Sequence, residues 1–228
     1  MTVEIIMHDL STRSSQRNID GMARFGINVE SALGVSNADL RIIAQGIKRE
    51  IKDKSARHNL ALELWDAGYH ETRILAGFID DYHLVTERQM DKWVSEFNSW
   101  AVCDTVCGQL LDKTPFAYKK ALEYTKRDEE FIKRAGFVLM AWLAVHDKKA
   151  DNKIFIEFLD VIAREAHDER NFVKKAVNWT LRQIGKSRKD DLVLQACIEK
   201  AKIIEKMDSK SARWIAKDAL RELAKYEK

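Results

Sequence analysis

Two stretches of this sequence nearly repeat one another: Phe131-Ile132-Lys133-Arg134-Ala135 and, 41 residues later, Phe172-Val173-Lys174-Lys175-Ala176. A second pair recurs at almost the same interval, since residues 181–185 read Leu-Arg-Gln-Ile-Gly and residues 220–224, 39 positions later, read Leu-Arg-Glu-Leu-Ala. All four stretches have the apolar spacing of amphipathic helices. The sequence therefore predicts a helical unit that recurs about every 40 residues.

A period near 40 residues is that of HEAT and armadillo units, in which pairs of helices stack side by side. Stacked helix pairs form a curved solenoid with a concave surface. We therefore predict an all-α fold, an α-α superhelix of HEAT-like repeats, and one domain covering residues 1–228.

The composition also favours helices. The chain has one Pro and nine Gly, too few for a β-sandwich or barrel with many tight turns, and 33% of its residues are charged. No segment alternates apolar and polar residues for long enough to predict a strand. The expected helices cover residues 2–10, 12–24, 36–52, 55–67, 70–80, 86–97, 99 onward, 115–124, 128–143, 151–166, 171–184, 190–206 and 209–226.

Several residues are expected to mark helix ends. Ser36, Thr86 and Ser99 are predicted N-caps. The single proline, Pro115, is predicted at the first position of a helix, where its missing N–H does no harm. Gly185 is predicted to end the helix that begins near residue 171.

Charge, cysteine content and hydropathy suggest where the protein works. The net charge is +3, and the three cysteines cannot all pair within one chain, so we expect a reducing compartment. No stretch approaches the roughly 18–20 apolar residues of a membrane span, and the first ten residues do not resemble a signal peptide. We expect a cytoplasmic protein with no membrane partner.

Trp100 and Asp104 are the first candidate for chemistry. They are four residues apart on a predicted helix, so their side chains point the same way. An aromatic face beside a carboxylate suits a substrate that carries positive charge. The alternative is ordinary packing of a half-buried Trp beside a solvated acid, and the pair alone leaves both interpretations open.

Basic residues recur with the repeat. Equivalent positions of stacked helices lie side by side, which predicts a basic stripe suited to a phosphate backbone. A solvated face interleaved with acids is the alternative. The predicted stripe comprises Lys133, Arg134, Lys174 and Lys175, and further along Arg182, Lys186, Arg188, Lys189, Lys210, Arg213 and Lys217.

The remaining tryptophans and cysteines are assigned by their neighbours. Trp179 lies beside the basic stripe rather than within an apolar run, and packing in the core is the alternative for it, as the default for any Trp. Four other tryptophans have apolar neighbours at helical spacing and are predicted to lie in the core: Trp65, Trp93, Trp142 and Trp214. Cys103 and Cys107 are interpreted as buried thiols. We expect no metal site and no cofactor, because no phosphate loop, nucleophile elbow or zinc-binding motif is present.

These elements together resemble the DNA alkylation repair proteins of the AlkD type, the alkylpurine DNA glycosylases built of HEAT-like repeats. The resemblance rests on Phe25-Gly26-Ile27, on Trp100 with Asp104, and on the stretches 131–135 and 172–182, the last reading Phe-Val-Lys-Lys-Ala-Val-Asn-Trp-Thr-Leu-Arg. The elements span nearly the whole chain in the family's order.

The resemblance implies a function and roles for individual residues. Trp100 and Trp179 look like the aromatic residues that flank the lesion, Asp104 like the catalytic carboxylate and Arg134 like an arginine that holds DNA near the lesion. The implied fold has a concave basic groove that grips double-stranded DNA. The implied reaction releases cationic N3- or N7-alkylated purines, such as 3-methyladenine and 7-methylguanine, without flipping the base into a pocket, in contrast to the usual strategy.

The chemistry agrees with this assignment. An N3- or N7-alkylated purine carries a formal positive charge and leaves as a neutral base, so that one carboxylate suffices where most sugar hydrolases need two. Asp104 would stabilise an oxocarbenium-like sugar and orient water.

Two other functions fit the same sequence: a non-catalytic relative that binds DNA structure, and a helical-repeat scaffold for proteins. Whether the protein cleaves DNA lesions or only binds DNA, we expect it to be a monomer associated with the nucleoid.

Overall fold

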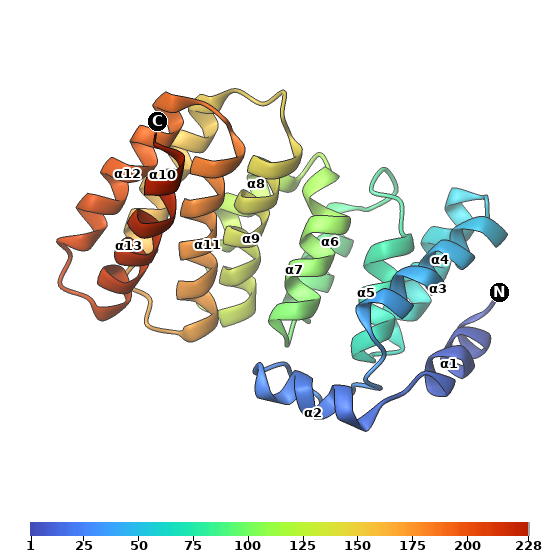
Figure 1. Cartoon of the computed structure of the whole chain (residues 1–228). Coiled ribbons are helices and arrows are strands. Elements are labelled where there is room, and N and C mark those ends of the chain that lie inside the picture. The colour runs from blue at the N-terminus through green and yellow to red at the C-terminus, as the bar shows by residue number, and fades with distance from the viewer. Residues whose placement is uncertain (228) are drawn as a thin grey trace. The chain divides into compact units, whose positions relative to one another are not determined.

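The computed structural model describes residues 1–227, and within them the backbone forms helices and turns without any strand (Figure 1). The prediction of an all-α fold is confirmed. Two compact units divide the chain, Met1–Thr114 and Pro115–Lys228. The prediction of a single domain stays a prediction, because two compact units can still unfold together. No helix among the described residues is long and apolar enough to cross a bilayer.

The first unit consists of seven α-helices and a short 3-10 helix. Helix α5 packs against α3, α4 and α7, and α1 contacts α4. Its core includes the parallel stack of Trp65 on Trp93, whose ring centroids are 4.1 Å apart, as predicted for these two residues. The helices are α1 (Val3–Thr12), α2 (Gln16–Arg24), α3 (Asn37–Glu50), α4 (Lys54–Asp66), α5 (His70–Ile79), α6 (Glu87–Ser95), α7 (Trp100–Gln109) and η1 (Leu111–Lys113).

The second unit shows the repeat directly. Its α-helices pack in consecutive pairs, α8 with α9, α10 with α11 and α12 with α13, and α11 lies between α9 and α13 (Figure 1). The elements are α8 (Ala117–Tyr124), α9 (Glu130–His146), α10 (Asn152–Glu165), α11 (Asn171–Ser187), α12 (Asp191–Glu205), α13 (Lys210–Leu223) and the 3-10 helix η2 (Ala224–Tyr226).

Contacts between successive repeats join residues about one period apart. The rings of Phe131 and Phe172, the first residues of the two matching stretches, stack with centroids 5.4 Å apart. The buried hydroxyl of Thr180 donates to the Phe137 carbonyl at 2.7 Å. The buried amide of Asn178 donates to the Ile215 carbonyl at 3.0 Å. Equivalent positions therefore lie side by side in this unit, as the repeat predicted.

The predicted N-caps are confirmed. Ser36 Oγ accepts from the Asp39 amide at 3.1 Å, Thr86 Oγ1 from the Gln89 amide at 3.1 Å, and Ser99 Oγ from the Ala101 amide at 3.2 Å. Each cap satisfies one of the amides that the first turn of a helix leaves without a partner.

Two predictions of helix ends were wrong. Pro115 is not the first residue of a helix but lies in the turn between η1 and α8. Gly185 does not end α11, which continues to Ser187. A side chain at Gly185 would place its Cβ 2.7 Å from Leu223 Cδ2, so this glycine serves the close approach of α13 rather than a helix end.

The prediction that Trp214 lies in the core was also wrong, since 44% of this residue is exposed, while Trp142 is half-buried. The buried side of α13 is formed by Ile215, Ala216 and Ala219, and Trp214 points away from it. Apolar neighbours in sequence therefore did not reveal which side of the helix the ring occupies.

We predict that Gly136→Ala destabilises the protein although alanine favours helices. A Cβ at Gly136 would lie 2.6 Å from the Thr125 amide nitrogen and 2.8 Å from the Ala121 carbonyl oxygen, both backbone atoms of the α8 segment. Overpacking of this kind costs about 1–3 kcal/mol. Thermal unfolding of the variant should show a lower midpoint than the parent.

The matched control is Gly46→Ala in α3, because nothing lies within 4 Å of a Cβ there. This substitution should raise the midpoint, as alanine is favoured over glycine in a helix by about 1 kcal/mol. Equal effects of the two substitutions would contradict the packing described at Gly136.

Candidate functional site

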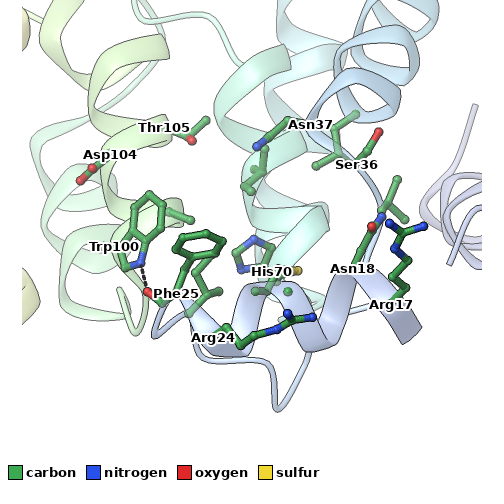
Figure 2. A pocket seen from close by; sticks show the side chains of 17 residues that line it. Arg17, Asn18, Arg24, Phe25, Ser36, Asn37, His70, Trp100, Asp104 and Thr105 are labelled. Atoms are coloured by element: carbon green, nitrogen blue, oxygen red, sulfur yellow. Dashed lines mark hydrogen bonds between the residues drawn. The ribbon is translucent and has the colours of Figure 1, made fainter. Parts of the chain in front are cut away.

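Trp100 and Asp104 lie on one wall of a cavity of about 580 Å³ in the first unit. Ser99 caps α7 so that Trp100 is its first residue, and Asp104 follows one turn later on the same side of the helix (Figure 2). Both side chains are half-buried. The structure thus brings this predicted pair to a cavity wall.

The rest of the cavity is lined by further residues of α7, by helices α2, α3 and α5, and by the loop between α2 and α3. Both polar and apolar side chains contribute to the lining. Its lining residues are Arg17, Asn18, Gly21, Met22, Arg24 and Phe25 from α2 and its end, Ile27, Val35, Ser36 and Asn37 from the following loop and the start of α3, Leu40 from α3, His70 and Ile74 from α5, and Ala101 and Thr105 from α7.

The indole of Trp100 is fixed by the backbone at the end of α2. Its Nε1–H donates to the Phe25 carbonyl at 3.0 Å, the bond drawn dashed in Figure 2. The chain turns at once after Phe25, because Gly26 has φ 71°, a conformation that favours glycine. Phe25 itself is 75% exposed. The Phe25-Gly26-Ile27 element of the sequence therefore meets Trp100 in space, although 75 residues separate Phe25 from it.

A buried carboxylate holds the loop that forms one side of the cavity. Glu71 is fully buried, and its Oε1 accepts from the Gly34 amide at 2.7 Å and the Val35 amide at 3.2 Å, while Oε2 accepts from the Leu33 amide at 2.9 Å. Three backbone donors compensate the burial of this charge. The loop in turn binds α2, since Asn18 Nδ2 donates to the Gly34 carbonyl at 2.8 Å.

Electrostatics differ between the two sides of the cavity. Arg17 and Arg24 extend from α2, and Asp104 stands on α7 (Figure 2). Burial lowers the pKa of His70, so its imidazole is neutral at pH 7. The cavity thus has an indole on α7 and two guanidinium groups on α2, and the Asp104 carboxylate lies at its edge on α7, directed away from the other labelled side chains (Figure 2).

The sequence prediction did not include Arg17, Arg24, His70 or Glu71 among the functional candidates. The spacing of Arg17, Gly21 and Arg24 by four and three residues places them on one side of α2 and was the available signal for the arginines. Nothing local signals the role of Glu71, because its partners lie 36–38 residues away.

The two cysteines next to Asp104 do not form a reactive site. Cys103 and Cys107 are buried and unbridged, as predicted. Burial raises the pKa of the Cys107 thiol well above its usual value, and the neighbouring Cys103 and the charge of Asp104 act in the same direction. Within residues 1–227 no group of three or more His, Cys, Asp or Glu side chains could hold a metal ion.

In the second unit, Trp179 is half-buried in an aromatic cluster. Its ring meets Trp142 edge-on at 5.5 Å, and Trp142 stacks on His146 at 4.9 Å. The guanidinium of Arg134 is buried and donates to the Phe172 carbonyl of the next repeat. Trp179 and Arg134 belong to this unit, whereas Trp100 and Asp104 belong to the first, so their predicted convergence at one lesion stays a prediction.

Several cations of the predicted stripe bind acids within the fold. Lys133 Nζ lies 2.9 Å from Glu165 and 3.7 Å from Asp168. Arg182 and Lys186 both pair with Glu222. Arg213 pairs with Asp208 at 3.3 Å. Lys174 lies over the Trp214 ring, and Lys175 is exposed. The predicted contacts of all these residues with DNA, and the concave basic groove, stay predictions.

Comparison with known proteins identifies the family. The family model described as DNA alkylation repair enzyme matches residues 6–223. The chain belongs to this family. The membership confirms the resemblance stated from the motifs.

A solved structure has the same fold. It is described as a new family of proteins related to the HEAT-like repeat DNA glycosylases with affinity for branched DNA structures. The TM-score is 0.79 over 97% of this chain and 95% of that chain, at 22% sequence identity. This similarity confirms the all-α fold of HEAT-like repeats for this chain. No curated protein matches the chain.

We predict that Glu71→Gln destabilises the cavity wall. The NH₂ group that replaces one carboxylate oxygen donates and cannot accept, so at least one backbone amide of residues 33–35 loses its acceptor, and the remaining bonds are no longer to a charged group. Hydrogen bonds to a charged group are worth about 1.5–3 kcal/mol. The urea midpoint of unfolding should fall accordingly.

Glu63→Gln on α4 is the control, since Glu63 is exposed and its substitution should leave the free energy of unfolding within about 0.5 kcal/mol of the parent's, with little change of the midpoint. The same midpoint for both variants would show that Glu71 does not hold the loop.

Proposed function

We propose that this protein hydrolyses the N-glycosidic bond of cationic N3- or N7-alkylated purines in double-stranded DNA. One observation carries the proposal: a half-buried Trp and a carboxylate stand one helical turn apart on a cavity wall, in a chain of the DNA alkylation repair family. That pair matches the charge of the proposed substrate, because the indole face and the carboxylate both attract a cation.

The reaction balances with a single carboxylate. The bond between the sugar C1′ and the purine N9 breaks, and its electron pair neutralises the positive charge of the alkylated base. Water adds to C1′ and loses one proton, which leaves a neutral base and an abasic site. No acid is needed to protonate the leaving group, so the reaction does not require the second carboxyl group that most glycoside hydrolases use as a general acid.

Asp104 is proposed as the catalytic residue. Positive charge develops on the sugar as the base departs, and a carboxylate held at the cavity wall stabilises that charge more than it stabilises the ground state. The same oxygen atoms can orient the attacking water. Trp100 would hold the cationic purine by cation–π contact, worth about 0.5–2 kcal/mol depending on desolvation.

Positioning of Trp100 supports this assignment. The hydrogen bond from its indole N–H to the Phe25 carbonyl fixes the ring before substrate arrives, and a fixed group loses less entropy on binding. Arg17 and Arg24 on the same cavity suit the phosphates beside a lesion. For Trp179 and Arg134, the family resemblance supports the roles of a second aromatic contact and a DNA contact.

A second candidate function is binding of branched DNA without catalysis. The observation that favours it is the solved structure of the same fold, whose protein is described as having affinity for branched DNA structures. The presence of Trp100 and Asp104 on a cavity favours the glycosylase instead.

The two candidates separate in an assay of 7-methylguanine release from methylated duplex DNA. The parent should release the base, and Asp104→Asn should slow release by about 10²–10³-fold, the usual cost of removing one group that stabilises transition-state charge. Binding of undamaged duplex by the variant should stay within about threefold of the parent, because Asn retains the shape of the side chain.

Asp66→Asn serves as the matched control, since this carboxylate on α4 is 61% exposed and its ion pair with Lys92 lies at the surface. It should release 7-methylguanine at the parent's rate. Equal rates for Asp104→Asn and the parent would refute the role of Asp104. No release by the parent, with binding of DNA intact, would favour the non-catalytic candidate.

A further inference from the structure

Helix α13 carries an exposed tryptophan among exposed cations. Trp214 is 44% exposed; on its side of the helix four side chains are basic, and one, Asp218, is acidic and 19% exposed. Positions three, four, seven and eleven residues apart share one side of an α-helix, which groups Lys210, Arg213, Trp214, Lys217 and Arg221. All five are exposed. We call this group the α13 face.

A cation of the preceding repeat extends the α13 face. Nζ of Lys174 on α11 lies 5.8 Å from the centroid of the Trp214 ring. This contact places a positive charge over one face of the indole, and a base would stack on the other face. Lys174 and Arg213 occupy equivalent positions of successive repeats, as do Lys175 and Trp214, so that the last repeat replaces a basic residue by an aromatic one.

Acidic residues neutralise only part of this charge. Arg213 pairs with Asp208, and Arg221 pairs with Asp218. Glu169 accepts from Ser209 Oγ at 3.1 Å and from the Ser211 amide at 3.0 Å, near Lys174 and Lys210. Within residues 1–227, Lys175, Lys210 and Lys217 form no ion pair. A polyanion would therefore find cations on this face that have no acid bound to them.

We propose that the α13 face binds an unpaired strand of DNA, with a base stacked on Trp214 and the phosphates on Lys174, Lys210 and Lys217. The proposal rests on the proposed function only in taking DNA as the ligand. Bases inside a duplex already stack on both faces, whereas a base in a single-stranded extension or at a branch offers a free face to an aromatic ring. Cations alone suit any phosphate backbone, but the exposed indole among them selects unpaired nucleotides.

The test compares two DNA ligands with equal numbers of phosphates, a blunt duplex and a duplex with a single-stranded extension of about ten nucleotides, a length within the usual site size for single strands. Dissociation constants come from fluorescence anisotropy of labelled DNA. The parent should bind the extended ligand about tenfold more tightly, a difference of about 1.4 kcal/mol.

Trp214→Ala should abolish that preference, and Trp214→Phe should keep most of it, because a phenyl ring still stacks. Leu192→Ala is the matched control, since Leu192 is 80% exposed on α12 and lies outside the α13 face; it should keep the full preference. The salt dependence of binding should be unchanged in Trp214→Ala, whereas Lys210→Ala and Lys217→Ala should each reduce its slope by about one.

Failure of this proposal differs from failure of the proposed function. Equal affinity of the parent for both ligands, or an undiminished preference in Trp214→Ala, would overturn the α13 proposal alone. Absence of any binding of DNA by the parent would overturn both. Release of 7-methylguanine from blunt duplex by Trp214→Ala at the parent's rate is expected, because the proposal gives this residue no part in bond cleavage.

Discussion

The packing of each repeat on the next is the interaction on which the structure depends. A pair of helices cannot bury its apolar side by itself, so every repeat needs a neighbour. In the second unit, the stacked rings of Phe131 and Phe172 join one repeat to the next. Buried hydrogen bonds from Thr180 and Asn178 to carbonyls of adjacent helices do the same. These contacts set the register in which α9, α11 and α13 present their side chains.

Repeat packing also decides which basic residues remain available for a ligand. Lys133 binds Glu165 and Asp168, while Arg182 and Lys186 share Glu222, so the charge of these three serves contacts between helices. Lys175, Lys210 and Lys217 are exposed and without an ion pair in the described part of the chain. A count of lysines and arginines along a helix therefore overstates the charge that DNA would meet.

Residues about 40 positions apart revealed the fold from sequence, because matching stretches of amphipathic helix imply neighbours in a stack. The Trp100–Asp104 pair was also predictable, since helical spacing alone places both side chains on one side of α7. Contacts between distant segments could not be predicted. The hydrogen bonds from the amides of residues 33–35 to Glu71 and from the indole of Trp100 to Phe25 have no local signature in the sequence. The exposure of Trp214 could not be predicted either, because this residue has apolar neighbours in sequence on both sides.

The central claim is that positive charge on the base, met by Trp100 and Asp104, drives its release. The most direct test is the single-turnover rate of release for 7-methylguanine and for a neutral lesion, hypoxanthine, at one position of the same duplex. We expect release of the cationic base and none of the neutral one above the uncatalysed background, because a neutral purine leaves as an anion unless an acid protonates it. Release of both bases at similar rates would contradict it.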